Sequence, residues 1–144
     1  MVMPADLIQA VAASIAHQPL VAAAWVFGSV ARAEARADSD LDIALLLKRP
    51  ATAAELVALY DIAADLEQTS PSGRVDLLVL GKQGVVLRHR VLQEGILVYD
   101  ADPTLRVEFE SRTIAEYLDW LPTHAIAMRS TLGGLHARFG QDAA

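Results

Sequence analysis

Cysteine is absent from this 144-residue chain, which excludes disulfide bonds, thiolate metal sites and a cysteine nucleophile. No hydrophobic run is long enough to cross a membrane without including a charge. The N-terminus lacks the basic and then apolar segments of a secretory signal. The formal net charge is −6, which disfavours non-specific binding to nucleic acid or to an anionic membrane. These absences predict a cytoplasmic protein that neither enters a membrane nor binds nucleic acid directly.

Several motifs of common enzymes are also missing. The chain has no glycine-lysine phosphate loop, no His-Glu-x-x-His zinc helix and no serine nucleophile elbow. It contains no internal repeat and no linker-like segment, and its length suits one domain with a substantial core. We therefore expect a single domain over residues 1–144, with a core at about 20–100 and a C-terminal helical segment at about 102–140.

The hydrophobic pattern predicts an α/β fold. Apolar runs that suit buried strands occupy residues 20–27, 40–47, 74–80 and 96–99. Between them, apolar residues recur at helical spacing. Helices are predicted to begin at Pro4, Val30, Thr52, Gln83 and Asp102. The last helix runs to about Phe139, and Pro122 is expected to kink or break it.

Apolar residues make up 53% of the chain. This content indicates either an apolar surface covered by a partner or an alanine-rich composition that inflates the value. Trp120 and residues 125–128 are candidates for such a surface, whereas we assign Tyr117 to the core.

Two carboxylates stand one residue apart at the start of the second predicted strand. Asp40 and Asp42 point to the same side, because side chains alternate along a strand. The cluster around Ser39 also suits a simple polar turn. That reading does not explain Asp42, which lies within an apolar run where an unpaired carboxylate is costly to bury. Together, Asp40 and Asp42 could share one cation or hold two.

A third carboxylate, Asp76, interrupts the next predicted strand. If that strand lies beside the second one, Asp76 comes close to Asp40 and Asp42, and divalent cations would offset the repulsion. The alternative is an ion pair between Asp76 and Arg74, which lie two residues apart on one strand face.

A glycine-serine turn follows the first predicted strand. Gly28 lets the backbone approach a ligand closely, and Ser29 is a candidate N-cap for the short helix at 30–35. A helix N-terminus suits a phosphate group. Arg32 lies one turn further on, where it could neutralise phosphate or pair with Asp38 or Glu34.

This pattern resembles the signature of the DNA polymerase beta superfamily of nucleotidyltransferases, and in particular its minimal nucleotidyltransferase (MNT) branch. The matching residues are Gly28-Ser29, Ala31-Arg32 and Ser39-Asp40-Leu41-Asp42, and the run from Arg88 to Tyr99 is also similar. The chain departs from the family at Ala33, where glycine is usual. The resemblance implies a small mixed sheet flanked by helices, with a long C-terminal helix.

The resemblance also implies a site and a reaction. Asp40, Asp42 and Asp76 would be the catalytic and metal-binding residues, holding two Mg²⁺ ions, with ATP as the substrate. The nucleotide-binding residues would be Gly28, Ser29, Arg32 and Ser39. Arg88 and Arg90 are both open as further nucleotide contacts.

MNT proteins of this size are commonly antitoxins paired with a HEPN-domain ribonuclease toxin. The resemblance thus implies AMP transfer to a tyrosine of that partner, which silences it. Two alternatives stay open. In one, the site is vestigial and the chain neutralises its toxin by binding alone. In the other, the acceptor is the hydroxyl of a small molecule.

Overall fold

The computed structural model describes residues 4–139, and side chains as far as residue 123. A four-stranded mixed sheet forms its centre, with the strand order β3-β2-β1-β4. The strands are β1 (Val21–Phe27), β2 (Leu41–Leu47), β3 (Val75–Val79) and β4 (Ile96–Asp100). β1 runs antiparallel to β2 and β4, whereas β2 and β3 are parallel. The predicted α/β class and mixed sheet are confirmed.

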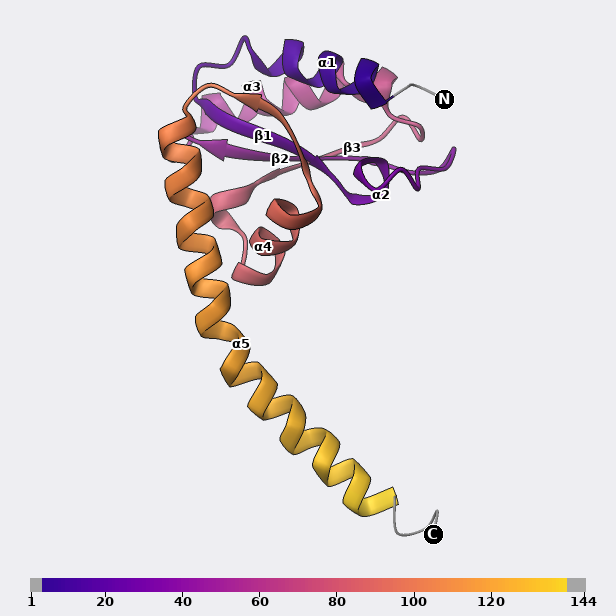
Figure 1. The fold of residues 1–144 in the computed structure, drawn as a ribbon. Helices are drawn as coiled ribbons and strands as arrows, with labels where there is room; N and C mark the ends of the chain where they lie inside the picture. Colours follow the sequence, from indigo (N-terminus) through magenta and orange to yellow (C-terminus); the bar gives the residue numbers. More distant parts are fainter. Residues whose placement is uncertain (1–3, 140–144) are drawn as a thin grey trace.

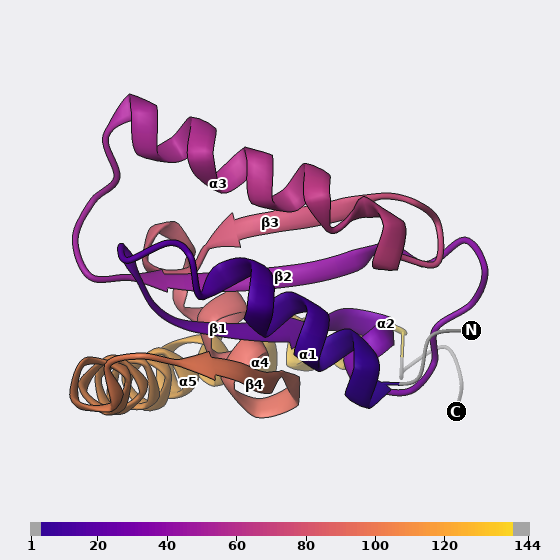
Figure 2. The same cartoon turned by 90° about the horizontal axis from the view of Figure 1, so that it is seen from above.

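Helices cover both faces of this sheet. On one face lie α1 (Pro4–Ile15) and α3 (Ala53–Asp65). On the other lie α4 (Val85–Glu94) and the start of the long α5 (Pro103–Phe139), which extends away from the body of the domain (Figures 1 and 2). The sheet thus separates two hydrophobic clusters, and the residues of β2 contribute to them alternately. Ile43 and Leu45 pack toward α1 and α3, while Ala44 and Leu46 pack toward α4 and α5.

Local sequence signals explain several element boundaries. α3 begins with the predicted capping box, in which Thr52 Oγ1 accepts from the N–H of Glu55 and the Glu55 carboxylate accepts from the N–H of Thr52. α4 ends at Gly95, as predicted. Among the described residues, no helix is both long and apolar enough to cross a membrane.

The predicted extent of the last helix is confirmed, because α5 runs to Phe139 and continues through Pro122 without a break. One prediction about helices is wrong. The helix predicted at 30–35 is instead the single turn α2 (Gly28–Ala31). Ala33 takes a left-handed conformation with φ of 57°, which ends the turn. Ser29 lies within this turn and is not its N-cap, because that position belongs to Phe27.

Candidate functional site

Two of the three predicted carboxylates are neighbours across the sheet. The parallel register pairs Asp42 of β2 with Asp76 of β3, and the antiparallel register pairs Asp42 with Phe27 at the end of β1. Asp42 alternates with Leu41 and Ile43, so its side chain shares the face of Ala44. The acidic pair therefore lies on the face of the sheet that α4 and α5 cover further along the strands.

Gly28 allows the chain to turn directly beside this pair. Its φ of +74° is a left-handed value that favours glycine. A Cβ atom at this position would overlap the carboxylate of Asp42, with Oδ2 as the nearest atom. The backbone after β1 thus passes against Asp42 with no side chain between them, which leaves the carboxylate accessible from the α2 turn.

The electrostatic environment of Asp42 is unfavourable to its charge. Burial raises the pKa of this half-buried carboxyl to about 6, with further raising by Asp76 and Asp40 and a smaller opposing effect of Arg32. Among the described side chains, an ionised Asp42 therefore lacks sufficient compensating charge. Such a group is ready to bind a cation.

Asp40 has a different environment. Its Oδ1 accepts hydrogen bonds from Ser72 Oγ at 2.7 Å and from Arg74 Nε at 3.0 Å. These two hydrogen bonds lower the pKa of Asp40, so the carboxylate stays ionised. The alternative ion pair predicted for Arg74, with Asp76, does not form; Arg74 pairs with Asp40 instead. This contact was missed because it joins two loops whose course the sequence pattern does not define.

The residues fit a divalent cation in part. Carboxylate oxygens are the ligands that Mg²⁺ prefers, and Asp42 and Asp76 lie side by side with only a small opposing effect of Arg32 on the charge of Asp42. Among the side chains described, those of residues 5–123, however, no group of three or more acidic or histidine side chains lies close enough to hold a metal ion. Asp40 could join the pair as a ligand if it exchanged its contact with Arg74 for the cation.

Two of the predicted nucleotide contacts, Arg32 and Ser39, have side-chain partners within the chain. Arg32 pairs with Glu34 at 3.1 Å, as its alternative reading predicted, and with Glu94 of α4 at 3.4 Å. Its charge nevertheless acts on Asp42, so it lies close to the acidic pair. Ser39 Oγ accepts from the N–H of Arg36 at 2.8 Å and thereby closes the loop before β2.

Arg88 has a structural position. Its guanidinium donates to the Gln83 carbonyl at 3.0 Å, to Thr113 Oγ1 at 3.3 Å and to the Glu116 carboxylate at 2.5 Å. These contacts connect α4 to α5, and Thr113 is fully buried between them. On the same pair of helices, the rings of His89 and Tyr117 stack with centroids 3.5 Å apart. Tyr117 is only partly buried and belongs to neither hydrophobic cluster, so its assignment to the core is wrong, because its ring packs on His89 at the surface between the two helices. Residues 125–128 lie outside the described side chains.

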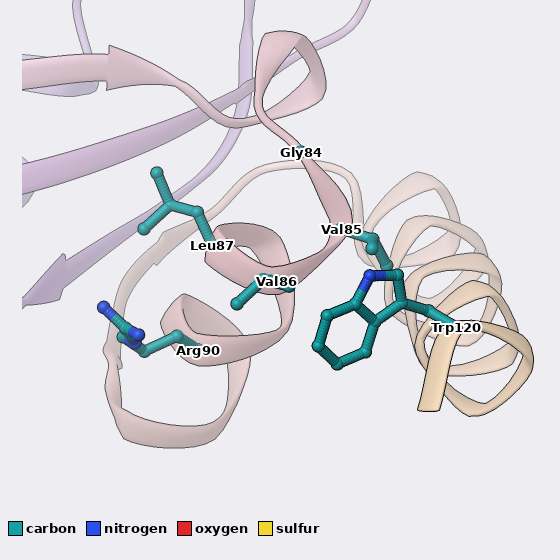
Figure 3. A pocket seen from close by; sticks show the side chains of 6 residues that line it. All are labelled: Gly84, Val85, Val86, Leu87, Arg90 and Trp120. Atoms are coloured by element: carbon teal, nitrogen blue, oxygen red, sulfur yellow. The ribbon is translucent and has the colours of Figure 1, made fainter. Parts of the chain in front are cut away.

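Arg90 lies instead beside a surface pocket of about 500 Å³. The pocket is formed by α4 and by Trp120 of α5, which reaches toward Val85 and Val86 (Figure 3). None of the candidate acidic residues lines it. The pocket and the acidic pair are therefore separate features.

Residues 9–104 match the family described as Polymerase beta, Nucleotidyltransferase. This match spans well over half of the chain, so the protein belongs to that family. A search of curated proteins gave no significant match.

Solved structures of toxin–antitoxin complexes show the same fold. The chain is similar to one with AMP-PNP, at 20% identity and a TM-score of 0.69, over 87% of this chain and 98% of the other. It is also similar to a tri-AMPylated Shewanella oneidensis HEPN toxin in complex with MNT antitoxin, at 19% identity and a TM-score of 0.66, over 90% and 99% of the two chains. An MntA–HepT complex gives 19% identity and a TM-score of 0.65, over 89% and 98%.

Proposed function

We propose that this chain is a Mg²⁺-dependent nucleotidyltransferase and the antitoxin of a HEPN-domain toxin, transferring AMP from ATP to a tyrosine hydroxyl of that partner. The observation that carries the proposal is the pairing of Asp42 with Asp76 against Gly28. Family membership supports the reaction class. The similar structures with AMP-PNP and with an AMPylated HEPN toxin support the nucleotide and the acceptor.

In the proposed reaction the acceptor oxygen bonds to the α-phosphorus of ATP while the bond to the β-phosphate oxygen breaks. The products are the AMP ester of the tyrosine and pyrophosphate. Bound Mg²⁺ would neutralise the phosphates and assist departure of pyrophosphate. Asp40, Asp42 and Asp76 would hold the cations, and Asp76 would accept the proton of the attacking hydroxyl.

The other residues position the nucleotide. Gly28 leaves the space beside Asp42 open, so a phosphate chain can lie against the backbone of the α2 turn. Ser29 and Arg32 would contact the β- and γ-phosphates, and Ser39 would maintain the loop that carries Asp40. This arrangement contributes by orientation and charge stabilisation more than by covalent chemistry.

A second candidate function is inhibition by binding alone. The ion pair between Arg74 and Asp40 favours this second function, because the Arg74 guanidinium then occupies the position that a metal ion would take at Asp40. A toxin held in a stable complex would be silenced in this case without modification.

The intact mass of the co-purifying partner separates these two functions. We would compare the wild-type chain with the double variant Asp40→Asn/Asp42→Asn, and use Asp61→Asn/Asp65→Asn on α3 as a control of equal charge change. Transfer is supported if the partner is heavier by one or more AMP units with the wild type and with the control, but not with Asp40→Asn/Asp42→Asn. A partner of unmodified mass that stays bound and inactive with all three forms would establish inhibition by contact.

A further inference from the structure

The outer edge of β3 is not paired with another strand of the described chain. β3 ends the strand order, and its single neighbour is β2. The carbonyl of Arg74 accepts from the N–H of Leu41 in β2. Because backbone groups alternate in direction along a strand, those of Val75 and Leu77 point away from β2. The Gln83 side chain donates to the carbonyl of Val79 at 3.2 Å and so closes the far end of this edge.

An apolar groove of about 260 Å³ follows the same edge. Leu77 belongs to the hydrophobic cluster on one face of the sheet and Leu78 to the cluster on the other, so a groove that both residues line opens at the edge itself. α3 forms the opposite wall, where Tyr60 is 64% exposed. The complete lining is Leu56, Leu59, Tyr60, Leu77, Leu78, Val79, Lys82 and Gln83.

The groove begins one residue along β3 from Asp76, and its α3 wall lies on the opposite face of the sheet from the Asp76 side chain. Leu77 directly follows Asp76, the exposed member of the acidic pair. In a sheet, residues opposite each other on adjacent strands have Cβ atoms about 4.5–5.5 Å apart and point to the same face. A strand added beside β3 would therefore place one side chain next to Asp76. The residues before and after it in the added strand would lie along the groove.

We infer that the β3 edge and its groove dock an extended segment of the polypeptide acceptor, with the acceptor tyrosine opposite Asp76. The inference rests on the proposed function and adds the mode of acceptor recognition. Free backbone groups beside an apolar groove suit an extended peptide, which gains affinity from main-chain hydrogen bonds and specificity from its side chains. The phenol oxygen would then lie where Asp76 can accept its proton as the bond to the α-phosphorus forms.

The test uses two substitutions on one helix. Tyr60→Arg places a long charged side chain in the groove, whereas Val57→Arg makes a similar change at a residue that is 61% exposed and does not line the groove. Both positions are exposed, so both variants should fold. AMP transfer is measured by mass spectrometry on the co-purifying HEPN-domain partner, on the peptide acetyl-Ser-Val-Tyr-Val-Ser-amide and on tyrosinamide.

The expected result is specific to polypeptide acceptors. Tyr60→Arg should raise the KM for the partner and for the peptide by about tenfold or more, with kcat and transfer to tyrosinamide unchanged. Val57→Arg should behave like the wild type. With the wild-type protein, N-methylation of every amide of the peptide should raise the KM for the peptide about as much as Tyr60→Arg does. The reason is that N-methylation removes the N–H groups that would pair with the β3 edge.

Other outcomes overturn the inference. Equal KM values for the wild type and Tyr60→Arg would exclude docking in this groove, while observed transfer would leave the proposed function standing. If Val57→Arg impaired transfer to the partner as much as Tyr60→Arg does, the effect would be unrelated to the groove. The same conclusion would follow if Tyr60→Arg impaired transfer to tyrosinamide as much as transfer to the partner. If the wild type modifies none of the three acceptors, the proposed function itself fails.

Discussion

Asp42 and Asp76 are direct partners in the parallel ladder between β2 and β3, so two carboxylates occupy adjacent positions on one face of the sheet. Repulsion from Asp76 adds to the burial of Asp42 and raises its pKa to about 6. This pair disfavours the folded state in the absence of cations, since Asp42 is not compensated when it is ionised. Under the proposed function, substitutions at this pair should therefore change the stability of the fold and the rate of transfer in opposite directions.

Replacing the charge at Asp42 should stabilise the metal-free protein at neutral pH. The folded-state pKa lies above the unfolded value of 3.8, so the folded state retains a proton between about pH 4 and 6 and stability falls as pH rises through that window. We expect Asp42→Asn to raise the free energy of unfolding by about 1–2 kcal/mol at pH 7, discounted for partial exposure, and to abolish transfer.

Urea denaturation in EDTA at pH 4.5 and pH 7 measures this effect. Asp61→Asn on α3 is the control, because it makes the same change at an exposed site outside the acidic pair. The difference in unfolding free energy between Asp42→Asn and the wild type should be larger at pH 7 than at pH 4.5. A constant difference would show that Asp42 titrates as it does in the unfolded chain.

Ala33→Gly should stabilise the fold. Ala33 has φ of 57°, and a left-handed conformation costs a non-glycine residue about 1–2 kcal/mol. Glycine relieves this cost but loses about 0.4–1 kcal/mol through the entropy of the unfolded chain. We therefore expect a net gain of about 0.5–1 kcal/mol, measured by urea denaturation. Ala37 does not have a positive φ, so the control Ala37→Gly should not increase stability.

Removing the positive charge beside Asp40 should strengthen cation binding. Arg74→Gln removes the ion pair at 3.0 Å and leaves Asp40 free to act as a metal ligand. The half-saturating Mg²⁺ concentration for AMP transfer should fall by roughly two- to fivefold, the range typical of an exposed ion pair. A higher Mg²⁺ requirement would show that Arg74 holds Asp40 in the arrangement that transfer needs.

Arg88 should matter for stability more than for nucleotide binding. Arg88→Ala removes three contacts and leaves the hydroxyl of Thr113 buried without this donor, which should cost about 2 kcal/mol in unfolding free energy. Arg90→Ala is the control at an exposed neighbour and should change stability by less than about 0.5 kcal/mol. An increased KM for ATP in the folded Arg88→Ala variant would contradict this assignment.

The sequence was sufficient for the strands and for the pairing of two acids. Charges inside apolar runs marked Asp42 and Asp76, and their proximity followed once adjacent strands were assumed. The start of α3 was also predictable, because the Thr52–Glu55 capping box acts over three residues. The strands and the start of α3 depend on local periodicity or on contacts within a single turn. The pairing of the two acids also required the assumption that β2 and β3 are neighbours.

The remaining features depend on contacts distant in sequence. The pairing of Asp40 with Arg74 spans 34 residues, and the contact of Arg88 with Glu116 spans 28. No local pattern specifies such partners, so Arg74 was considered for Asp76 and Arg88 for the nucleotide. The left-handed conformation of Ala33 was missed for another reason, because alanine favours helix, although the glycine that is usual here in the family was an available signal. The roles of Ser29 and Ser39 toward nucleotide stay predictions.

β3 and β4 each have one neighbouring strand, whereas β1 and β2 each have two. Local opening of the sheet should therefore begin at these edge strands, as strands with fewer partners separate at lower free energy, and at one edge it separates β3 from β2. Such an opening removes Asp76 from Asp42 while the rest of the sheet persists. Amide exchange at β3 and loss of transfer should consequently show the same dependence on denaturant concentration. The slope of this dependence should be smaller than the slope for global unfolding. Activity would then report on the integrity of a single edge strand.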